Sequence, residues 1–323
     1  MRIITDMAGR TVELPDQINK IFAPSPYAST LLMSLCPEKL CGLFFPIEEY
    51  QKQYLNPCLF DKPVIGKVTE AQAIKEAKPD VILIWGDKAN PIHPKSEKAL
   101  AEIGIPHIYA CCDELVDLRD YPAIYRFLGE VLGIEERAEK LAVYCEETLA
   151  EAAELVNSVH PQHRPRVYYA EGKDGTQTEY SHSLHAHLLN LIGDVNVHRG
   201  NLVGHPGMEQ LTDEQILAYD PEVIIVWLKE AYERIISFSS KTPSVAFGAS
   251  SPTIRGGASW GEISAVKNNR VYLIPVEPFS YFDRPPCFMR ILGLKWLLSI
   301  CYPEIYKKNY EEEKAEFLKL FFN

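Results

Sequence analysis

Short apolar runs alternate with helix-like segments through the first third of the chain. RTVELP alternates apolar and polar side chains, as a half-buried strand does, and VILIWG is continuously apolar, as a fully buried strand is. TEAQAIKEAKPD has helical spacing, with Thr69 as its expected N-cap and Pro79 beyond its end. The pattern predicts strands at residues 10–15, 20–26, 40–46, 81–86 and 105–112, and helices at residues 27–40, 69–80 and 95–104. This alternation is typical of parallel α/β layers.

The pattern changes at Tyr121 and later restarts. Residues 135–159 carry apolar or Ala residues at helical spacing without Gly or Pro, which predicts a helix well above the mean length of about 11–12 residues. A helix of this length in mid-chain can join two lobes. Beyond it, the sequence predicts strands at residues 166–172, 223–228 and 270–275, and helices at residues 183–197, 212–222 and 285–303. Thr212 is the expected N-cap of the second of these helices.

One sequence segment occurs twice in similar form, about half a chain apart. We call it the repeated phrase. IKEAKPDVILIWG at residues 74–86 returns as ILAYDPEVIIVWL at residues 216–228. The pairs that match at a constant offset are Pro79 and Pro221, Asp80 and Glu222, and Trp85 and Trp227. Residues 20–26 and 105–110 find counterparts, in the same order, at residues 166–172 and 270–275. We interpret the repeat as the helix–strand step of two similar lobes.

The predicted fold class is therefore α/β, with two Rossmann-like lobes, mainly parallel central sheets, one long rigid α-helix joining the lobes, and a ligand cleft between them. We expect an N-terminal lobe at residues 1–120, a linker region with the long helix at residues 121–160, and a C-terminal lobe at residues 161–323. The length of 323 residues is sufficient for two medium-sized cores.

Ligands of parallel α/β sheets bind beyond the carboxyl ends of the strands. The corresponding loops are expected at residues 24–27, 44–54, 85–94, 170–183, 227–234 and 275–286. They contain aromatic, cationic and hydroxyl side chains that suit an anionic ligand with an organic shell. The candidate contacts are Ser25, Tyr27, Trp85, Lys88, His93, Tyr180, His182, Trp227, Lys229, Tyr232, Tyr281 and Arg284. The two tryptophans, which end buried strands, fit core packing and a cleft wall equally well.

Composition removes several classes of function. With 44 acidic and 33 basic residues, the chain has a formal net charge of −11, which argues against sequence-independent nucleic-acid binding. No apolar run approaches the roughly 20 residues of a membrane span. MRIITDMAGR lacks the layout of a signal peptide, so we expect either a cytosolic protein or a mature form without its export segment. The eight cysteines contain no CxxC pair, and no phosphate-binding GxxxxGK[ST] motif occurs.

Five segments in order along the chain carry a family resemblance. They are ITDMAGRTVELP, KIFAPSPY, AKPDVILIWG, SLHAHLLNLIGDVNV and YFDRPPCFMRILGLKWLLSICYPEIY. Together they resemble the substrate-binding proteins of ABC importers for iron-siderophore and related metal complexes, the class with a helix between its lobes. The resemblance implies a non-catalytic protein, in the periplasm or lipid-anchored at the cell surface. We expect it to be a monomer, since no coiled-coil pattern or broad exposed apolar face is visible in the sequence. It would capture an Fe(III)-siderophore and deliver it to a permease and, through that permease, to the ATPase.

The resemblance also implies one carboxylate on each lobe that contacts permease arginines. The matching position is Glu214 in the second lobe and Gln72 in the first, where Glu70 can substitute for the missing carboxylate. Acidic residues at these positions also favour helix N-termini through the helix dipole, and both interpretations can hold together.

Histidines raise the question of direct metal contact. His93 and His182, one from each lobe, can ligate a metal that has open positions in its chelate. The simpler alternative is that each is a solvated loop residue. We expect Arg284, Lys88 and Lys229 to offset the charge of an anionic chelate, with no covalently bound cofactor. Alternative cargoes are a corrinoid such as cobalamin, haem, a nickel complex or molybdate. A chelatase is the alternative from another class, with His182 and either Glu179 or Glu171 as its reacting pair.

Overall fold

The computed structural model describes residues 1–86, 94–110, 117–200, 208–239 and 259–322. The chain forms two compact units. The first unit consists of Met1–Ala150, Val276–Leu292 and Asn309–Asn323, and the second of Glu151–Pro275 and Gly293–Lys308. Helix α5, Glu135–Ser158, is continuous over 24 residues, and the boundary between the units falls within it. Among the described helices, none combines the length and apolar composition that crossing a membrane requires.

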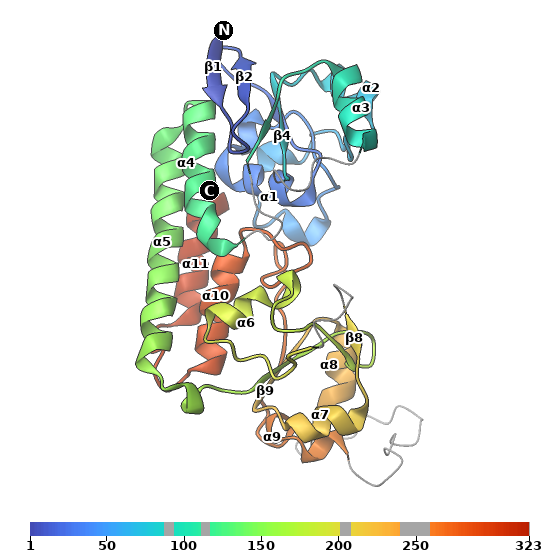
Figure 1. The fold of residues 1–323 in the computed structure, drawn as a ribbon, viewed down its shortest axis with the longest axis vertical. Helices are drawn as coiled ribbons and strands as arrows, with labels where there is room; N and C mark the ends of the chain where they lie inside the picture. The colour runs from blue at the N-terminus through green and yellow to red at the C-terminus, as the bar shows by residue number, and fades with distance from the viewer. Residues whose placement is uncertain (87–93, 111–116, 201–207, 240–258, 323) are drawn as a thin grey trace. The chain divides into compact units, whose positions relative to one another are not determined.

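The first unit contains a parallel three-stranded sheet in the order β3-β4-β5, labelled in part in Figure 1. Its strands are β3 (Ile21–Phe22), β4 (Val81–Ile84) and β5 (His107–Tyr109). An antiparallel hairpin, β1 (Arg2–Thr5) and β2 (Thr11–Leu14), precedes them. Helices of this unit are α1 (Pro26–Leu35), α2 (Ala71–Ala77), α3 (Pro94–Ile103), α4 (Tyr121–Leu132) and α11 (Tyr310–Phe322). β4 is buried along its whole length, as its apolar sequence predicts.

The second unit repeats this arrangement. Its parallel sheet has the order β10-β9-β6, from β6 (Val167–Ala170), β9 (Val223–Val226) and β10 (Val271–Leu273). A small antiparallel pair joins β7 (Gln177–Thr178) to β8 (Glu209–Gln210). Its helices are α6 (His187–Leu191), α7 (Asp213–Tyr219), α8 (Lys229–Ile236) and α9 (Ser264–Lys267), while α10 (Arg290–Cys301) begins in the first unit and ends in the second.

The repeated phrase has the same structural role in both units. In the first, the backbone N–H of Asp80 donates to the carbonyl of Lys20 at 2.8 Å, and its carboxylate accepts from the backbone N–H groups of Asn19 and Lys20. In the second, the N–H of Glu222 donates to the carbonyl of Arg166 at 2.8 Å, and its carboxylate accepts from the N–H of Arg166 at 2.9 Å. The acidic residue after the repeated proline thus attaches each central strand to the neighbouring strand at its start.

β4 and β9 lie in different sheets, one in each unit. The predicted fold class, two α/β lobes with parallel sheets and one long helix, is confirmed. The division at residues 1–120, 121–160 and 161–323 stays a prediction.

Several local predictions were wrong. Residues 40–46 form no strand of their own but two single bridges, Leu40 to Ile21 and Leu43 to Val64. The loop expected at residues 227–234 is largely helix α8, because Ala231 and Ile235 recur at helical spacing and pack into the core. Thr69 is not the cap of α2, since Glu70 occupies the N-cap position. Residues 183–197 form, in place of one helix, a 3₁₀ turn, Leu184–Ala186, the short helix α6 and a single bridge from Asn196 to Val167.

Remaining 3₁₀ turns connect these elements. They are Pro37–Lys39, Glu49–Gln51, Pro57–Leu59, Leu118–Asp120, Pro161–His163 and Trp260–Glu262. Helix α11 was not predicted. Its residues Phe317 and Phe321 are fully buried and stack with ring centroids 4.2 Å apart, so tertiary packing of one helical face stabilises it.

Candidate functional site

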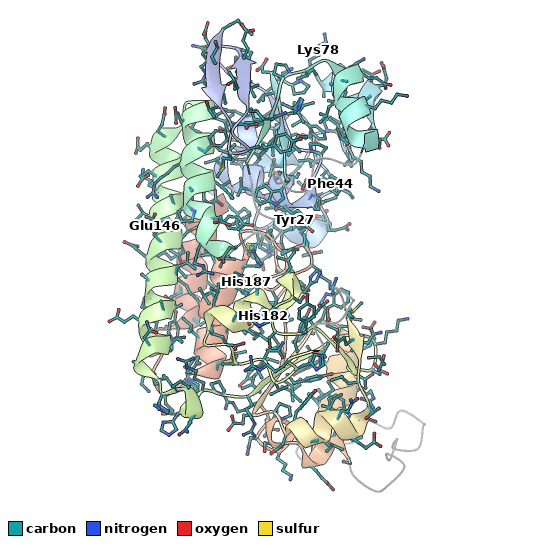
Figure 2. The ribbon with its side chains drawn as sticks, in the orientation of Figure 1. Tyr27, Phe44, Lys78, Glu146, His182 and His187 are labelled. Carbon is teal, nitrogen blue, oxygen red and sulfur yellow. The ribbon has the colours of Figure 1, made fainter. Side chains whose placement is uncertain are left out.

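Two strand ends of the first unit bring Tyr27 and Trp85 together. Ser25 follows β3 as the N-cap of α1, with Pro26 at the first helical position and no cap bond from the Ser25 side chain. Trp85 follows β4 directly. The rings of Tyr27 and Trp85 lie 6.4 Å apart between centroids, so residues far apart in sequence meet at the carboxyl edge of the sheet. Tyr27 is labelled in Figure 2.

Trp85 packs against a second aromatic ring of the first unit. Its ring also lies 6.2 Å from that of Tyr121, which is fully buried, while Trp85 and Tyr27 are themselves only half-buried. The indole N–H is buried and has no hydrogen-bond acceptor among the described residues. The ring therefore packs against one buried and one half-buried aromatic ring of the first unit, and its contact with a ligand stays a prediction.

Charged side chains from the segment before α10 and from the first residue of α10 lie close to Tyr27. Asp283 and Arg290 are fully buried, and Arg284 pairs with Asp283 at 3.3 Å between Nε and Oδ2. Burial raises the pKa of the Tyr27 hydroxyl, and the nearby Arg290 guanidinium partly opposes this rise. Tyr27 therefore remains a hydroxyl donor at neutral pH. Aromatic, hydroxyl and guanidinium groups are thus assembled within one unit.

Contacts within the first unit hold this segment in place. The Gln51 side-chain amide donates to the carbonyl of Pro278 at 2.7 Å, and the rings of Phe45 and Phe279 lie 5.9 Å apart. Tyr281, a predicted ligand contact, is fully buried, and burial raises the pKa of its hydroxyl. Its side chain is therefore part of the core of the first unit.

The strand ends of the second unit carry a different set of groups. Glu171 follows β6 and is fully buried, and the backbone N–H of Trp227, after β9, donates to the carbonyl of Ala170 at 3.0 Å. The segment at residues 179–183, which we name the 179–183 loop, carries two predicted contacts: Tyr180, which is half-buried, and His182, which is exposed and labelled in Figure 2.

Buried polar contacts determine the conformation of this loop. Glu179 is fully buried, and its carboxylate accepts from the Ser183 hydroxyl at 2.7 Å. The side-chain amide of Asn196 donates to the backbone carbonyl of Glu179 at 3.0 Å. The Glu179 carboxylate, which the chelatase alternative uses, is thus engaged by a neighbouring hydroxyl.

The other predicted contacts fall outside these groups. Lys229 is exposed on α8 and lies 3.7 Å from Glu233, while Tyr232 packs against the core of the second unit. Lys88 and His93 lie outside the described residues. Among the residues that the structure describes, no group of three or more His, Cys, Asp or Glu side chains could hold a metal ion. The predicted ligation by His93 and His182 stays a prediction.

The two predicted docking positions differ in their surroundings. In the first unit, Glu70 is exposed and makes no side-chain cap bond, and the exposed Gln72 donates to Glu76 at 2.8 Å. In the second, Glu214 is exposed in the first turn of α7, behind a capping box formed by Thr212 and Gln215.

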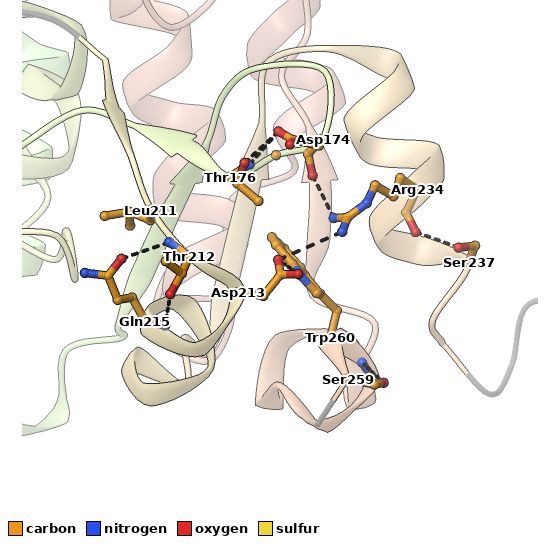
Figure 3. A network of polar contacts seen from close by, with 12 residues as sticks. Asp174, Thr176, Leu211, Thr212, Asp213, Gln215, Arg234, Ser237, Ser259 and Trp260 are labelled. Carbon is orange, nitrogen blue, oxygen red and sulfur yellow. Dashed lines mark hydrogen bonds and ion pairs between the residues drawn. The ribbon is translucent and has the colours of Figure 1, made fainter. Parts of the chain in front are cut away.

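A polar network holds the first turn of α7 in place (Figure 3). The carboxylate of Asp213 accepts from the indole N–H of Trp260 at 2.7 Å and lies 3.9 Å from the guanidinium of Arg234. Arg234 also donates to the carbonyl of Asp174 at 2.7 Å. Glu214, the residue after Asp213, is therefore presented from a helix turn with a defined position.

Sequence reasoning missed two buried groups, Asp283 and His198. Asp283 stands next to the predicted Arg284 in the run DRPP, but its burial cannot be read from that run. His198, which contacts Tyr219 and Glu209, gave no signal either, because its partners are distant in sequence.

Comparisons with known proteins agree with this architecture. The family model described as periplasmic binding protein matches residues 73–278. The molybdate-binding protein MolA of Haemophilus influenzae is 22% identical over 329 residues, covering 94% of this chain and 85% of that protein. An uncharacterised ABC transporter substrate-binding lipoprotein, YvrC of Bacillus subtilis, is 22% identical over 243 residues, covering 72% of this chain and 64% of that protein.

Solved structures resemble the whole chain. An ABC transporter solute-binding protein from Sulfurospirillum deleyianum is 34% identical, with a TM-score of 0.82 over 99% of this chain and 95% of that one. The structure of Haemophilus influenzae MolA bound to molybdate is 20% identical, with a TM-score of 0.71 over 100% of this chain and 98% of that one. The chain therefore belongs to the periplasmic binding protein family and is a substrate-binding protein of an ABC transporter, not an enzyme.

Proposed function

We propose that this protein captures an anionic metal-containing solute outside the cytoplasm and delivers it to an ABC importer. The observation that carries the proposal is the group of Tyr27, Trp85 and Arg284 in the first unit. Two of these follow adjacent parallel strands, and the charge of Arg284 acts on the Tyr27 hydroxyl. Hydroxyl, indole N–H and guanidinium groups are all hydrogen-bond donors, which match oxygen atoms that carry negative charge.

Two cargoes of this chemistry are candidates. The first is a ferric siderophore with a net negative charge, whose organic shell would contact the aromatic rings of Tyr27 and Trp85. The second is molybdate, and the observation that favours it is the similarity to the molybdate-binding protein MolA over nearly the whole chain. In both cases oxygen atoms of the cargo accept hydrogen bonds from the protein.

Thermal shift and equilibrium dialysis test the proposal. The probes are an iron(III) tricatecholate complex, sodium molybdate, sodium sulfate and neutral cyanocobalamin. A ligand at 100 times its dissociation constant stabilises the native state by about 2.7 kcal/mol, which raises Tm by several degrees. We expect one equivalent of either the ferric complex or molybdate to bind. Saturable binding of cyanocobalamin alone would contradict an anionic cargo.

Arg284→Gln tests the role of charge. Because a hydrogen bond to a charged group contributes roughly 1.5–3 kcal/mol, the variant should bind the anionic probe about tenfold or more weakly. Arg126→Gln is the matched control, since Arg126 lies on α4 of the same unit and pairs with Glu139 and Glu146 of α5. Equal affinities of wild type and Arg284→Gln for the anionic probe would show that Arg284 does not bind it.

We further propose that Glu214 contacts the permease, with Glu70 as the first-unit counterpart. Both are exposed carboxylates at the N-terminal ends of equivalent helices. In vesicles that contain the importer, Glu214→Lys should reduce stimulation of ATP hydrolysis by the binding protein and leave cargo affinity unchanged. Wild-type stimulation by Glu214→Lys would refute the contact.

A further inference from the structure

A buried histidine lies behind the 179–183 loop. His198 is 5% exposed, and both of its ring nitrogens are engaged. Nε2 lies 2.8 Å from the carboxylate of Glu209, and Nδ1 lies 3.1 Å from the hydroxyl of Tyr219. Because a carboxylate only accepts, we assign the ring proton to Nε2, and Nδ1 then accepts from Tyr219. The imidazole thus connects β8 to the last residue of α7.

The same residue holds the 179–183 loop through its backbone. The carbonyl of His198 accepts from the hydroxyl of Ser181 at 3.1 Å, and its N–H donates to the side chain of Asn196 at 3.0 Å. The amide of Asn196 in turn donates to the carbonyl of Glu179. The residues on both sides of Tyr180 are therefore connected to His198, Ser181 directly and Glu179 through Asn196.

Two further features place Tyr180 against this support. Glu209, the imidazole partner, pairs with Thr178 in the β7–β8 ladder, two residues before Tyr180. Gly200 has a φ of +69°, and a Cβ at this position would collide with the Cβ of Tyr180. Only a residue without a side chain allows the backbone after His198 to approach the tyrosine so closely.

We propose that His198 is a positioning residue that holds the 179–183 loop, with Tyr180 and His182, on the end of helix α7 in the geometry that binds cargo. The proposal rests on the proposed function for its last step, because it takes the loop to be part of the cargo site. The positioning itself depends only on contacts within the second unit.

Amide hydrogen exchange of the full-length protein without cargo tests the positioning directly. His198→Ala removes both imidazole contacts, so exchange of amides at residues 179–183 should accelerate by about tenfold or more. His198→Gln retains a donor toward Glu209 and should restore most of the protection. His160→Ala, a change at an exposed histidine of the same unit, should leave exchange as in wild type.

The sheet of the second unit supplies the internal reference. Amides of β6 and β9 should keep their wild-type exchange in every variant, since their ladder does not involve His198. Equal acceleration of loop and sheet in His198→Ala would overturn the proposal, because His198 would then stabilise the unit as a whole. Unchanged exchange of the loop would overturn it as well.

Cargo affinity separates this proposal from the proposed function. With molybdate and the iron(III) tricatecholate complex as probes, His198→Ala should bind the active probe about tenfold more weakly, with His198→Gln in between. If neither probe binds wild type, the proposed cargo class fails, while the exchange data still decide whether His198 positions the loop. Accelerated loop exchange with wild-type affinity would show that the loop is not part of the cargo site.

Discussion

Each unit contains one helix–strand step: α2 to β4 in the first unit and α7 to β9 in the second. The two steps are alike at the C-terminal ends of their helices and differ at the N-terminal ends. At the end of each helix, Lys78 and Asp220 adopt the left-handed conformation, and the acidic residue two positions later holds the neighbouring strand. At the start, α7 has a capping box and the Trp260–Asp213 contact, whereas α2 has no side-chain cap.

This difference shows which part of the repeat the fold requires. The C-terminal half of the phrase sets the register of a central strand, where a change would disturb three paired strands. The N-terminal half lies on the surface, where capping contributes stability but does not determine the fold. The two units therefore agree more closely in the C-terminal half of the repeat than in its N-terminal half.

The largest expected effect comes from the shared half. Ile82 in β4 and Ile224 in β9 occupy equivalent positions and are both fully buried. Replacing either with Ala should lower the free energy of unfolding by about 2–5 kcal/mol, since each leaves a cavity in a packed core. Urea unfolding of the two variants measures this loss. A loss below 1 kcal/mol in one unit alone would show that the two strands are not equivalent.

Replacing the acidic residue after the repeated proline should give the second largest loss in the free energy of unfolding. Asp80→Ala removes an acceptor for two backbone N–H groups, and Glu222→Ala removes an acceptor for one. Because both sites are partly exposed, we expect losses of about 1.5 kcal/mol for Asp80→Ala and about half as much for Glu222→Ala. Glu316→Ala, on the exposed face of α11, serves as the control in the same urea series. The reverse order would contradict the assigned contacts.

Loss of the N-cap residue should destabilise the protein more in the second unit than in the first. Thr212→Ala removes the side chain that accepts from the N–H of Gln215 and should cost about 1 kcal/mol. Glu70→Ala should change stability by much less, because its side chain makes no cap bond. Thermal unfolding compares the two, and Thr212→Ser should behave as wild type. Equal losses at both positions would mean that α2 has a cap after all.

The smallest effect concerns pH. Hydrogen bonds from the backbone N–H and hydroxyl of Ser264 hold the pKa of Asp220 below its usual range. The stability from this shift is present above the unfolded pKa of about 3.9 and is lost as pH falls through the lower folded value. Lys78 has no carboxylate at the equivalent position.

Asp220→Asn should therefore reduce the acid sensitivity of unfolding between about pH 4 and pH 2. The expected change is about 0.5 kcal/mol or less, because the side chain is about half-exposed and solvent screens its interactions. Unfolding free energies of wild type and variant at pH 6, 4 and 3 measure it. A variant that is more acid-sensitive than wild type would reverse the sign of the assigned shift.

The sequence predicted the elements with strong local patterns. Continuous apolar runs identified β4 and β9, and Thr212 correctly marked the start of α7. It failed where structure depends on distant partners. Residues 40–46 are apolar enough for a strand but pair only through isolated bridges. Helix α8 was missed because a binding loop was expected at its position.

For the candidate site, residue types could be predicted but surroundings could not. Tyr27, Trp85 and Arg284 follow from strand ends and from the family resemblance. That Tyr281 is buried, or that Asp283 pairs with Arg284, depends on how the segment before α10 packs against residues more than 200 positions earlier, such as Gln51.

By itself, the sequence determined that two copies of one helix–strand step lie on either side of a long helix, because hydrophobic periodicity and proline act locally. Only the tertiary structure decided which charged groups are buried and which residues hold the 179–183 loop. Burial and hydrogen bonding depend on chain segments that meet only after folding, and their free energies come from those contacts rather than from local preference.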